Sequence, residues 1–560
     1  MNAPCSIRSA ALAASAGTGK TFALSSRYLA LLAAGAEPAS IAALTFTRKA
    51  AGEILARILG RLAAGARTDR AFQALSAELA DAGLPGFADR AAAQAALRRM
   101  IRDLPRLRVG TLDSFFLQVL RQFRLECGIG ADLAIAPEQD EPENDLVLQR
   151  LLDPRALPAD EQRGLLETFK LATFGEEKKS VYAAIQRLIE NQSELYQRAP
   201  DESAWGSPAR IWPDGSAPAA APAPDWSAVE AALAAQAETL RTDAQRKAWA
   251  QFGESLQAVR GGGDFEFGAT LGDRLYAAFA APGGRCESVA FGRGEIALLP
   301  ATQAALAATF AHVRHALVFR HAARTRGLCH LLAAYVRERR AHVARTGQLA
   351  FADVAQLLAP ASGRTPAHLR RQLDGRLDAR FRHWLLDEFQ DTSLVQWAVL
   401  ENLLDEVLQN PDGDRTLFYV GDVKQAIYEW RSGDPRLFRR ILGKYNRPGR
   451  PPALDVAPPL VKSWRSSPVV LDAVNRVFGD LPNLPLPDAD KFGDDWRAIA
   501  ARWAADWMPH AAADKNLYLS GHVALHVLPR PQADDDRPTI ARAADLVAEW
   551  RDAVPDFKRL

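Results

Sequence analysis

A lysine and a threonine follow two glycines near the start of the chain, a pattern that suits the binding of phosphate groups. The segment reads Ala14-Ser15-Ala16-Gly17-Thr18-Gly19-Lys20-Thr21. The two glycines allow successive backbone N–H groups to turn inward around phosphate oxygens, and the helix expected next would point its positive end at the same place. Lys20 would reach the β and γ phosphates of ATP, and the Thr21 hydroxyl would ligate Mg²⁺. The whole segment is therefore a predicted ATP-binding site.

One position departs from the usual form of this pattern, G-x-x-x-x-G-K-[ST]. Ala14 stands where the first glycine is expected. The alternative interpretation is a glycine-rich turn that carries a lysine by chance. The context, a short apolar run followed by a helical pattern, favours the nucleotide site. The pattern leaves open what the energy of the nucleotide is used for.

A second group of polar residues follows an apolar run much later, in the sequence LLDEFQDTS. The run 384–386 reads as a buried strand, and in parallel α/β sheets ligands collect where such strands end. Asp387 is a candidate for holding Mg²⁺ through water, and Glu388 for accepting a proton from the water that attacks the phosphate. The alternative is a pair of solvated carboxylates at a helix start. The phosphate-binding pattern in the same chain favours the catalytic interpretation.

Three further stretches carry side chains suited to the same chemistry. Gln425 lies just past the expected strand 417–422 and can report the γ-phosphate through a hydrogen bond that hydrolysis removes. Tyr428 and Trp430 offer flat faces on which unpaired bases can stack, although a core position is the alternative for Trp430. Arg465 can reach the γ-phosphate from a different domain, which would couple hydrolysis to domain closure.

The elements expected around these side chains alternate between strands and helices. Near the N-terminus the expected order is strand 9–14, helix 22–34, strand 41–47 and helix 50–62. The same alternation returns after about residue 380, with HWLLDEF, a helix and TLFYVGD. Such alternation is typical of βαβ units, so we expect an α/β fold with a parallel sheet and flanking helices.

The middle of the chain has a different pattern, which predicts a mostly helical insertion over roughly residues 126–345. The expected helices are 145–152, 179–194, 226–241 and 301–345. The segment 446–460 carries five prolines, and we place a domain boundary there. Beyond it we expect a strand, a turn and a helix from Val461 on, and another strand at 521–529.

Length and composition limit the class of protein. With 560 residues the chain exceeds the usual size of one hydrophobic core, so two or more domains are expected. Its 48% apolar and 24% charged residues are ordinary for a globular protein, and a net charge of +2 means that any nucleic-acid surface is local. The four cysteines lack zinc-site spacing, and neither a signal peptide nor a long apolar run is present. We therefore expect a cytoplasmic protein without a membrane span.

The strongest local charge lies within the expected helix 301–345. From Arg314 to Arg345 this stretch holds eight arginines and one carboxylate, Glu338. It could follow a phosphate backbone and add salt-dependent affinity, or it could be a solvated helix face whose arginine stems cover neighbouring side chains. Both interpretations stay open. His312 and His315 could share a helix face, but no carboxylate or thiol lies close by in sequence, so no metal site is expected there.

Six stretches in this order resemble the motifs of the UvrD/Rep-like DNA helicases of superfamily 1. They are ASAGTGKTF, LTFTRKAAGEI, VGTLDSFF, LLDEFQDTS, YVGDVKQAIYEWRSGD and WRSSPVVLDAVN. The chain looks closest to the RecB/AddA branch (exonuclease V beta and related proteins), whose members join a helicase to a nuclease in double-strand-break processing. The resemblance implies a RecA-like P-loop NTPase domain 1A at 1–125 and 346–445, with a helical insertion, domain 1B, at 126–345. Residues 446–560 would start a second RecA-like domain, 2A.

The resemblance also implies roles for individual residues. Those that would touch single-stranded DNA are Phe46, Thr47, Arg48, Ser114, Phe115, Tyr428 and Trp430. Those that would sense or stabilise the γ-phosphate are Gln425, Arg431 and Arg465. Gln390 would lie in the ATP site and couple the nucleotide to the DNA-binding segments.

Three departures from the family pattern accompany the resemblance. Asp113 stands where histidine is frequent, no glutamine precedes the ATP-binding segment, and no motif V or motif VI follows. We therefore expect the N-terminal part of a longer protein, which uses ATP and Mg²⁺ to move along single-stranded DNA from 3′ to 5′ and to separate strands in recombinational repair. Other subunits of a helicase–nuclease complex are the expected partners. Two alternatives stay open: an ATP- and DNA-binding fragment without motor activity, and a P-loop enzyme acting on a small molecule.

Overall fold

The computed structural model describes most of the chain, and the statements below concern the described residues. They are residues 7–130, 132–135, 142–152, 181–213, 221–260, 271–280, 286–292, 294–359, 375–377, 380–410, 414–426, 433–483, 489–526 and 537–553. The chain forms two compact units: unit 1 comprises residues 1–112, 377–393 and 403–560, and unit 2 comprises residues 113–376 and 394–402. Each unit is described by itself.

Unit 1 is built around a six-stranded sheet in which every neighbouring pair is parallel. Its strands, in spatial order, are β10 (Asp455–Leu460), β1 (Ala10–Ala14), β9 (Thr416–Gly421), β8 (His383–Leu386), β2 (Ile41–Thr45) and β3 (Arg108–Thr111). The inner strands β2, β8 and β9 are buried along their whole length, as their unbroken apolar runs require. The predicted α/β fold with a parallel sheet is confirmed.

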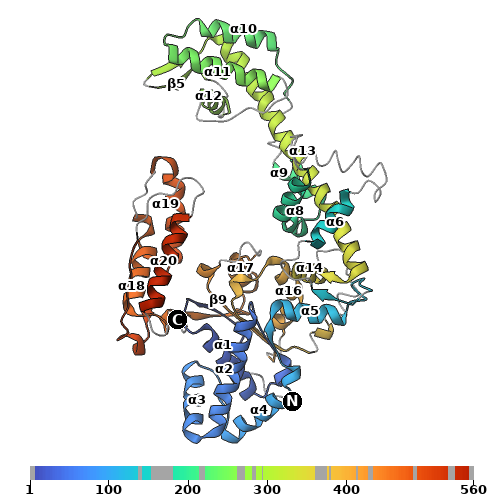
Figure 1. Cartoon of the computed structure of the whole chain (residues 1–560), viewed down its shortest axis with the longest axis vertical. Helices are drawn as coiled ribbons and strands as arrows, with labels where there is room; N and C mark the ends of the chain where they lie inside the picture. The colour runs from blue at the N-terminus through green and yellow to red at the C-terminus, as the bar shows by residue number, and fades with distance from the viewer. Residues whose placement is uncertain are drawn as a thin grey trace. The chain divides into compact units, whose positions relative to one another are not determined.

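Four helices pack with this sheet into one apolar core (Figure 1). They are α1 (Lys20–Ala33), α2 (Arg48–Arg67), α3 (Asp69–Asp81) and α4 (Arg90–Arg102). Three of their starts are set by side-chain caps: the side chains of Thr47, Thr68 and Asp89 accept hydrogen bonds from backbone N–H groups of the first turns of α2, α3 and α4. The helix predicted at 50–62 is therefore α2, which runs longer at both ends.

The proline-rich segment holds a strand that the sequence pattern did not predict. β10 contains Pro458 and Pro459 and pairs with β1 alone. An edge strand tolerates proline because one side of it needs no hydrogen-bond donors. The proline-rich segment therefore adds an edge strand to the sheet of unit 1, and the residues from Val461 on follow this strand.

The remainder of unit 1 is mostly helical. Its elements are α17 (Arg436–Tyr445), β11 (Lys462–Ser463), α18 (Pro468–Gly479), α19 (Ala489–Asp506), β12 (Ala511–Ala512) and α20 (Arg537–Ala553). The strand, turn and helix expected from Val461 on are present, with β11 parallel to β12. The strand predicted at 521–529 is wrong for its described part, since 521–526 has no regular structure. Val523 and Leu525 lie exposed there without a partner strand among the described residues, so alternation alone did not create a strand.

Unit 2 carries the helical insertion. Its elements are α5 (Leu112–Gln122), β4 (Ala134–Ile135), α6 (Pro142–Leu152), α8 (Val181–Arg198), α9 (Pro208–Ile211), α10 (Trp226–Ala237), α11 (Asp243–Arg260), α12 (Leu271–Ala280), β5 (Ser288–Phe291), β6 (Gly294–Ala297), α13 (Pro300–Thr346), β7 (Gln348–Leu349) and α14 (Phe351–Leu358). One further helix, α16 (Leu394–Gln409), has residues in both units.

The helix predicted at 301–345 is α13, which has 47 residues. Pro300 opens its first turn, and Gly347 ends it in the left-handed conformation. Two separate apolar clusters form along it: one with α10, α11 and α12 around Phe310, and one with α6 and α8 around Leu332. α13 is thus the element that the two cores of unit 2 share (Figure 1).

Candidate functional site

The predicted phosphate-binding segment lies where β1 passes into α1, at the carboxyl end of the sheet. Gly17 and Gly19 have φ values of 69° and 101°, which side chains other than glycine rarely adopt. The Thr18 hydroxyl donates to the carbonyl of Ser15 at 2.7 Å and closes the turn. α1 begins directly at Lys20, so its unpaired N–H groups face the interior of this loop. The local geometry is that of an anion-binding loop.

The segments that follow β1 and β8 meet through an ion pair. Lys20 Nζ lies 2.5 Å from Glu388 Oε2, with Lys20 buried and Glu388 about one-third exposed. Asp387 directly precedes Glu388, and its backbone N–H still belongs to the sheet, donating to the carbonyl of Leu44 at 2.8 Å. Lys20 and Glu388, which are 368 positions apart in sequence, are therefore brought into contact by the parallel order of the strands.

Glu388 has a left-handed backbone. Its φ is 49° and its ψ is 45°, and it is the one non-glycine residue with positive φ in the described part of the chain. A non-glycine residue in this region costs about 1–2 kcal/mol unless its surroundings hold it there. Two contacts do so: Lys20 Nζ, and Gln390 Nε2, which donates to Glu388 Oε2 at 2.8 Å. This strain turns the carboxylate toward the phosphate loop.

The carboxylates of Asp387, Glu388 and Asp391 lie close enough to Lys20 to interact with its single positive charge. Burial, and then the charge of Glu388, raise the pKa of Asp387 and that of Asp391 to about 6, while Lys20 acts in the opposite direction. One oxygen of Asp387 and one of Asp391 are buried without a hydrogen-bond partner among the described residues. Oxygen ligands with surplus negative charge suit Mg²⁺. Asp387 and Thr21, which lies in the first turn of α1, would hold it through oxygen atoms.

The raised pKa of Asp391 gives a prediction about stability. Above pH 6 the folded chain holds this buried carboxyl in its disfavoured ionised form. Below its ordinary pKa of 3.8 the group is neutral in folded and unfolded chains alike. Asp391→Asn should therefore raise the thermal unfolding midpoint at pH 8 by about 2–6 °C without nucleotide or Mg²⁺. The gain should shrink as the pH is lowered toward 4.5.

Circular dichroism melts at several pH values measure this effect. The exposed Asp514, replaced by asparagine, is the control and should leave the midpoint unchanged at each pH. Equal midpoints for Asp391→Asn and the parent at pH 8 would mean that the ionised Asp391 costs the folded state nothing.

Gln390 joins the ends of β8 and β9. Its Oε1 accepts the backbone N–H of Asp422 at 2.9 Å, while its Nε2 reaches Glu388. A Cβ at Gly421 would lie 2.6 Å from Gln390 Oε1, so this contact depends on a glycine at the end of β9. Gln425, one short turn further, donates from Nε2 to Asp422 Oδ2 at 2.6 Å. The two glutamines predicted from the sequence thus meet at Asp422, which no motif argument singled out.

The turn that holds Arg465 packs against the phosphate loop. The backbone N–H of Trp464 donates to the carbonyl of Gly17 at 2.8 Å. A Cβ at Gly17 would lie 2.8 Å from Arg465 Cβ, closer than two carbons can approach. The Ser463 hydroxyl accepts the backbone N–H groups of Arg465 and Ser466, which closes the turn. Arg465 is therefore placed at the loop by backbone contacts.

Trp464 is a residue that the sequence reasoning left without a role. It is 53% exposed, and its Cδ1 lies 3.9 Å from where a Cβ on Gly19 would be. Lys515 Nζ lies 5.2 Å from the centre of its ring and covers one face. The signal in the sequence that could have identified it is an aromatic residue directly before the predicted arginine.

The residues predicted to contact DNA fall into three groups. Phe46, Thr47 and Arg48 follow β2 in unit 1 at the carboxyl end of the sheet, and the side chain of Thr47 caps α2. Ser114 and Phe115 lie on α5 in unit 2, where Phe115 is only 4% exposed and therefore offers little surface for a ligand. Tyr428 and Trp430 lie outside the described residues, and so does Arg431, a residue predicted to sense or stabilise the γ-phosphate.

Several arginines of the basic stretch on α13 make contacts within unit 2. Arg339 is buried and pairs with Asp353 at 2.7 Å, Arg326 donates to the carbonyl of Gly206 at 2.9 Å, and Arg345 pairs with Glu338 at 3.1 Å. These three guanidinium groups have structural partners. The stretch therefore presents fewer available charges than its composition suggests.

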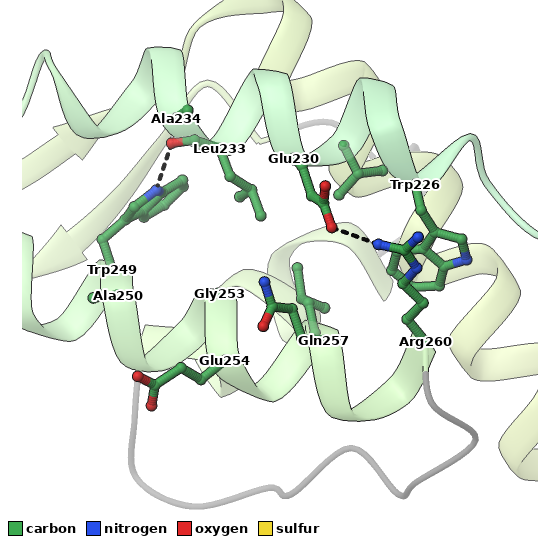
Figure 2. A pocket seen from close by; sticks show the side chains of 12 residues that line it. Trp226, Glu230, Leu233, Ala234, Trp249, Ala250, Gly253, Glu254, Gln257 and Arg260 are labelled. Carbon is green, nitrogen blue, oxygen red and sulfur yellow. Dashed lines mark hydrogen bonds and ion pairs between the residues drawn. The ribbon is translucent and has the colours of Figure 1, made fainter.

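A groove in unit 2 is lined by none of the predicted site residues. Figure 2 shows this groove, of about 410 Å³, between α10 and α11. Trp249 closes one end by donating to the carbonyl of Leu233, and Arg260 pairs with Glu230 at the other end at 2.6 Å. The side chains that line the groove hold α10 and α11 together. Their types and contacts do not suggest a catalytic site.

Comparisons with known proteins show what the chain is similar to. A family model described as the UvrD/REP helicase N-terminal domain matches residues 3–446. The RecBCD enzyme subunit RecB of Chlamydia pneumoniae is 36% identical over 104 residues, which are 18% of this chain and 9% of that protein. Two proteins named as subunits of an ATP-dependent helicase/nuclease match as well. The one from Natranaerobius thermophilus is 29% identical over 188 residues (32% of this chain, 14% of that protein), and the one from Anoxybacillus flavithermus is 32% identical over 172 residues (31% and 13%). The matches thus span a small part of each relative's length.

Proposed function

Because the chain belongs to the UvrD/REP helicase family, we propose that it is the ATP-hydrolysing motor part of a DNA helicase that moves along single-stranded DNA. One observation carries the proposal: Lys20, Glu388 and the turn of Arg465 all meet at the loop between β1 and α1. These are a phosphate-binding cation, a carboxylate that can accept a proton, and an arginine on a following segment. The movement from 3′ to 5′ that we propose rests on family resemblance.

The structure suggests how this site would work. Lys20 is paired with Glu388. A γ-phosphate would compete for Lys20 Nζ and would leave the Glu388 carboxylate free to accept a proton from water. Mg²⁺, when held by Thr21 and Asp387, supplies positive charge to the phosphate oxygens. In this proposal Trp464 would offer a flat face for the base, and Arg465 would stabilise charge on the γ-phosphate.

Hydrolysis would be coupled to DNA through the segments at the same edge of the sheet. In this proposal Phe46, Thr47 and Arg48 contact the strand from the end of β2. Ser114, Phe115, Tyr428 and Trp430 complete the predicted contacts and stay predictions. The assignment of residues 1–125 and 346–445 to domain 1A, 126–345 to domain 1B and 446–560 to the start of domain 2A also stays a proposal.

The names of the relatives suggest the biological setting. They describe a subunit of the RecBCD enzyme and subunits of ATP-dependent helicase/nucleases. We propose that this chain likewise acts on DNA in recombination and repair, in the cytoplasm, together with other subunits. Within the described residues no helix is both long enough and apolar enough to cross a membrane.

Phosphate release measured with and without single-stranded DNA tests the proposed motor. We expect DNA to raise the rate of ATP hydrolysis at least about tenfold, and Lys20→Ala to reduce the stimulated rate by about 100-fold or more, because the variant loses the cation that holds the β and γ phosphates. Lys247→Ala, which changes an exposed lysine on α11, is the matched control.

The result also separates the alternatives. Binding of ATP and DNA with a parent rate no higher than that of Lys20→Ala would favour a fragment that binds without doing work. Hydrolysis that is insensitive to DNA would favour a P-loop enzyme acting on a small molecule.

A further inference from the structure

Asp422 is the centre of a hydrogen-bond network behind the proposed hydrolysis site. Its carboxylate is buried and accepts from Lys424 Nζ at 2.9 Å, from the Lys424 backbone N–H at 3.1 Å and from Gln425 Nε2 at 2.6 Å. Its own backbone N–H donates to Gln390, which in turn donates to Glu388. The Asp422 carboxylate therefore orients Gln425 and the Asp422 backbone N–H orients Gln390, while Lys424 forms an ion pair with that carboxylate.

Lys424 also faces an aromatic cluster on the C-terminal segment of unit 1. Its Nζ lies 6.0 Å from the ring centre of Trp507, just after α19. Trp507 stacks on Phe478 of α18, with ring centres 4.9 Å apart and an angle of 20°, and lies 4.8 Å from the ring of His510. We call Phe478, Trp507 and His510 the aromatic cluster. It is firmly held, because Asn475 exchanges two hydrogen bonds with the backbone of His510 at 2.8 and 2.9 Å.

The charges of Lys424 and Asp422 both act on His510 of the aromatic cluster. Burial lowers the pKa of His510, the charge of Lys424 lowers it further, and the charge of Asp422 acts against both. The indole N–H of Trp507 is buried without an acceptor in the described part of the chain. Trp507 thus presents a ring face to Lys424, and none of the three residues of the aromatic cluster carries a carboxylate that could compete with Asp422. The ammonium group of Lys424 bridges Asp422 on one side and Trp507 on the other.

We propose that Lys424 is a positioning residue that makes the geometry of the hydrolysis site depend on the place of the C-terminal segment. While Trp507 lies beside it, Lys424 holds the Asp422 carboxylate in the orientation that aims Gln425, and the backbone N–H of the same Asp422 holds Gln390. When the segment moves, Lys424 loses its aromatic contact and Asp422 loses its fixed partner. The catalytic part of this proposal rests on the proposed ATP hydrolysis, whereas the physical link between nucleotide site and aromatic cluster does not.

Kinetics of three variants test the role of Lys424. Lys424→Ala should lower the kcat of DNA-stimulated hydrolysis about tenfold or more while the KM for ATP stays within about twofold, because Lys20 and Thr21 are untouched. Lys424→Arg should recover most of the rate, since arginine also pairs with a carboxylate and lies over aromatic rings. Trp507→Ala should lower kcat similarly, and adding it to Lys424→Ala should cause little further loss.

Arg439→Ala is the matched control. Arg439 of α17 pairs with Asp506, the neighbour of Trp507, at 2.6 Å, so it joins the same two regions without touching Asp422. Its kcat should stay within about twofold of the parent. A parent-like kcat for Lys424→Ala, or an equal loss in Arg439→Ala, would overturn the positioning role.

A second readout does not need hydrolysis. In the full chain labelled with 5-fluorotryptophan, the ¹⁹F resonance of Trp507 is identified by its disappearance in Trp507→Phe. Adding Mg²⁺ with a non-hydrolysable ATP analogue should shift this resonance in the parent and in Arg439→Ala, but not in Lys424→Ala. The other resonances show whether each variant is folded.

The two readouts separate the two proposals. A shift in the parent that depends on Lys424, together with no DNA-stimulated hydrolysis, would refute the motor function and keep the link between the sites. DNA-stimulated hydrolysis without any shift at Trp507 would refute the link and keep the motor function.

Discussion

Glu388→Gln should retain ATP binding and lose hydrolysis, with kcat falling by about 10²–10⁴-fold, the range expected when a general base is removed. Glutamine preserves the shape of the side chain and its hydrogen bond to Gln390, but it cannot take a proton from the attacking water. Lys20 would also be released from its 2.5 Å ion pair with this carboxylate, so ATP affinity should be equal to that of the parent or higher.

Single-turnover phosphate release and equilibrium binding of a fluorescent ATP analogue measure the two quantities separately. Glu78→Gln is a suitable control, because Glu78 also forms an ion pair in unit 1, with Arg61 at 2.8 Å, away from the loop. If Glu388→Gln hydrolyses ATP at the parent rate, another group is the base. If the variant fails to bind ATP, Glu388 has a structural role that the ion pair alone does not explain.

Gly17→Ala should weaken ATP binding by at least about tenfold and lower DNA-stimulated hydrolysis further. Two effects combine. A side chain at φ 69° costs about 1 kcal/mol or more, and the new Cβ would lie 2.8 Å from Arg465 Cβ. The loop can relieve this clash by moving away from the turn 463–466, which would separate the arginine from the phosphate site.

A matched glycine separates the two effects. Gly35 has a φ of 92° but nothing within 4 Å of the position that a Cβ would take, so Gly35→Ala carries the backbone strain without the clash. It should reduce stability slightly and leave ATP binding unchanged. Isothermal titration with ATP and Mg²⁺ compares the variants, and parent-like affinity in Gly17→Ala would show that the turn of Arg465 tolerates displacement.

The sequence predicted those parts of the fold and site that depend on local patterns. The apolar runs of β1, β2, β8 and β9 and the glycines at 17 and 19 are local signals, and the resulting α/β sheet is confirmed. The helix predicted at 301–345 was accurate because a proline opens it and a glycine ends it. Residues that follow parallel strands meet at one edge by geometry, which is why Lys20 and Glu388 could be assigned together.

The features that depend on long-range contacts could not be predicted in this way. β10 pairs with β1 across more than 440 residues, and its prolines argued for a domain boundary. The left-handed backbone of Glu388 is held by Lys20 and Gln390, so its own residue type gave no signal. The contact between Lys424 and Trp507 joins segments that no motif connects. The strand predicted at 521–529 shows the opposite error, since an alternating pattern without a neighbouring strand remained irregular over its described part.

The strand β10 limits how far Arg465 can move from the phosphate loop. β10 ends at Leu460 within the sheet that carries the phosphate loop, and Arg465 follows five residues later. Even a fully extended connection of this length reaches only about 17 Å. This short connection keeps the guanidinium group near the phosphate loop even when the rest of the C-terminal segment moves. Its effective concentration at the loop is therefore in the millimolar range or above. Reassembly after each turnover would be a short-range search within one molecule, independent of protein concentration.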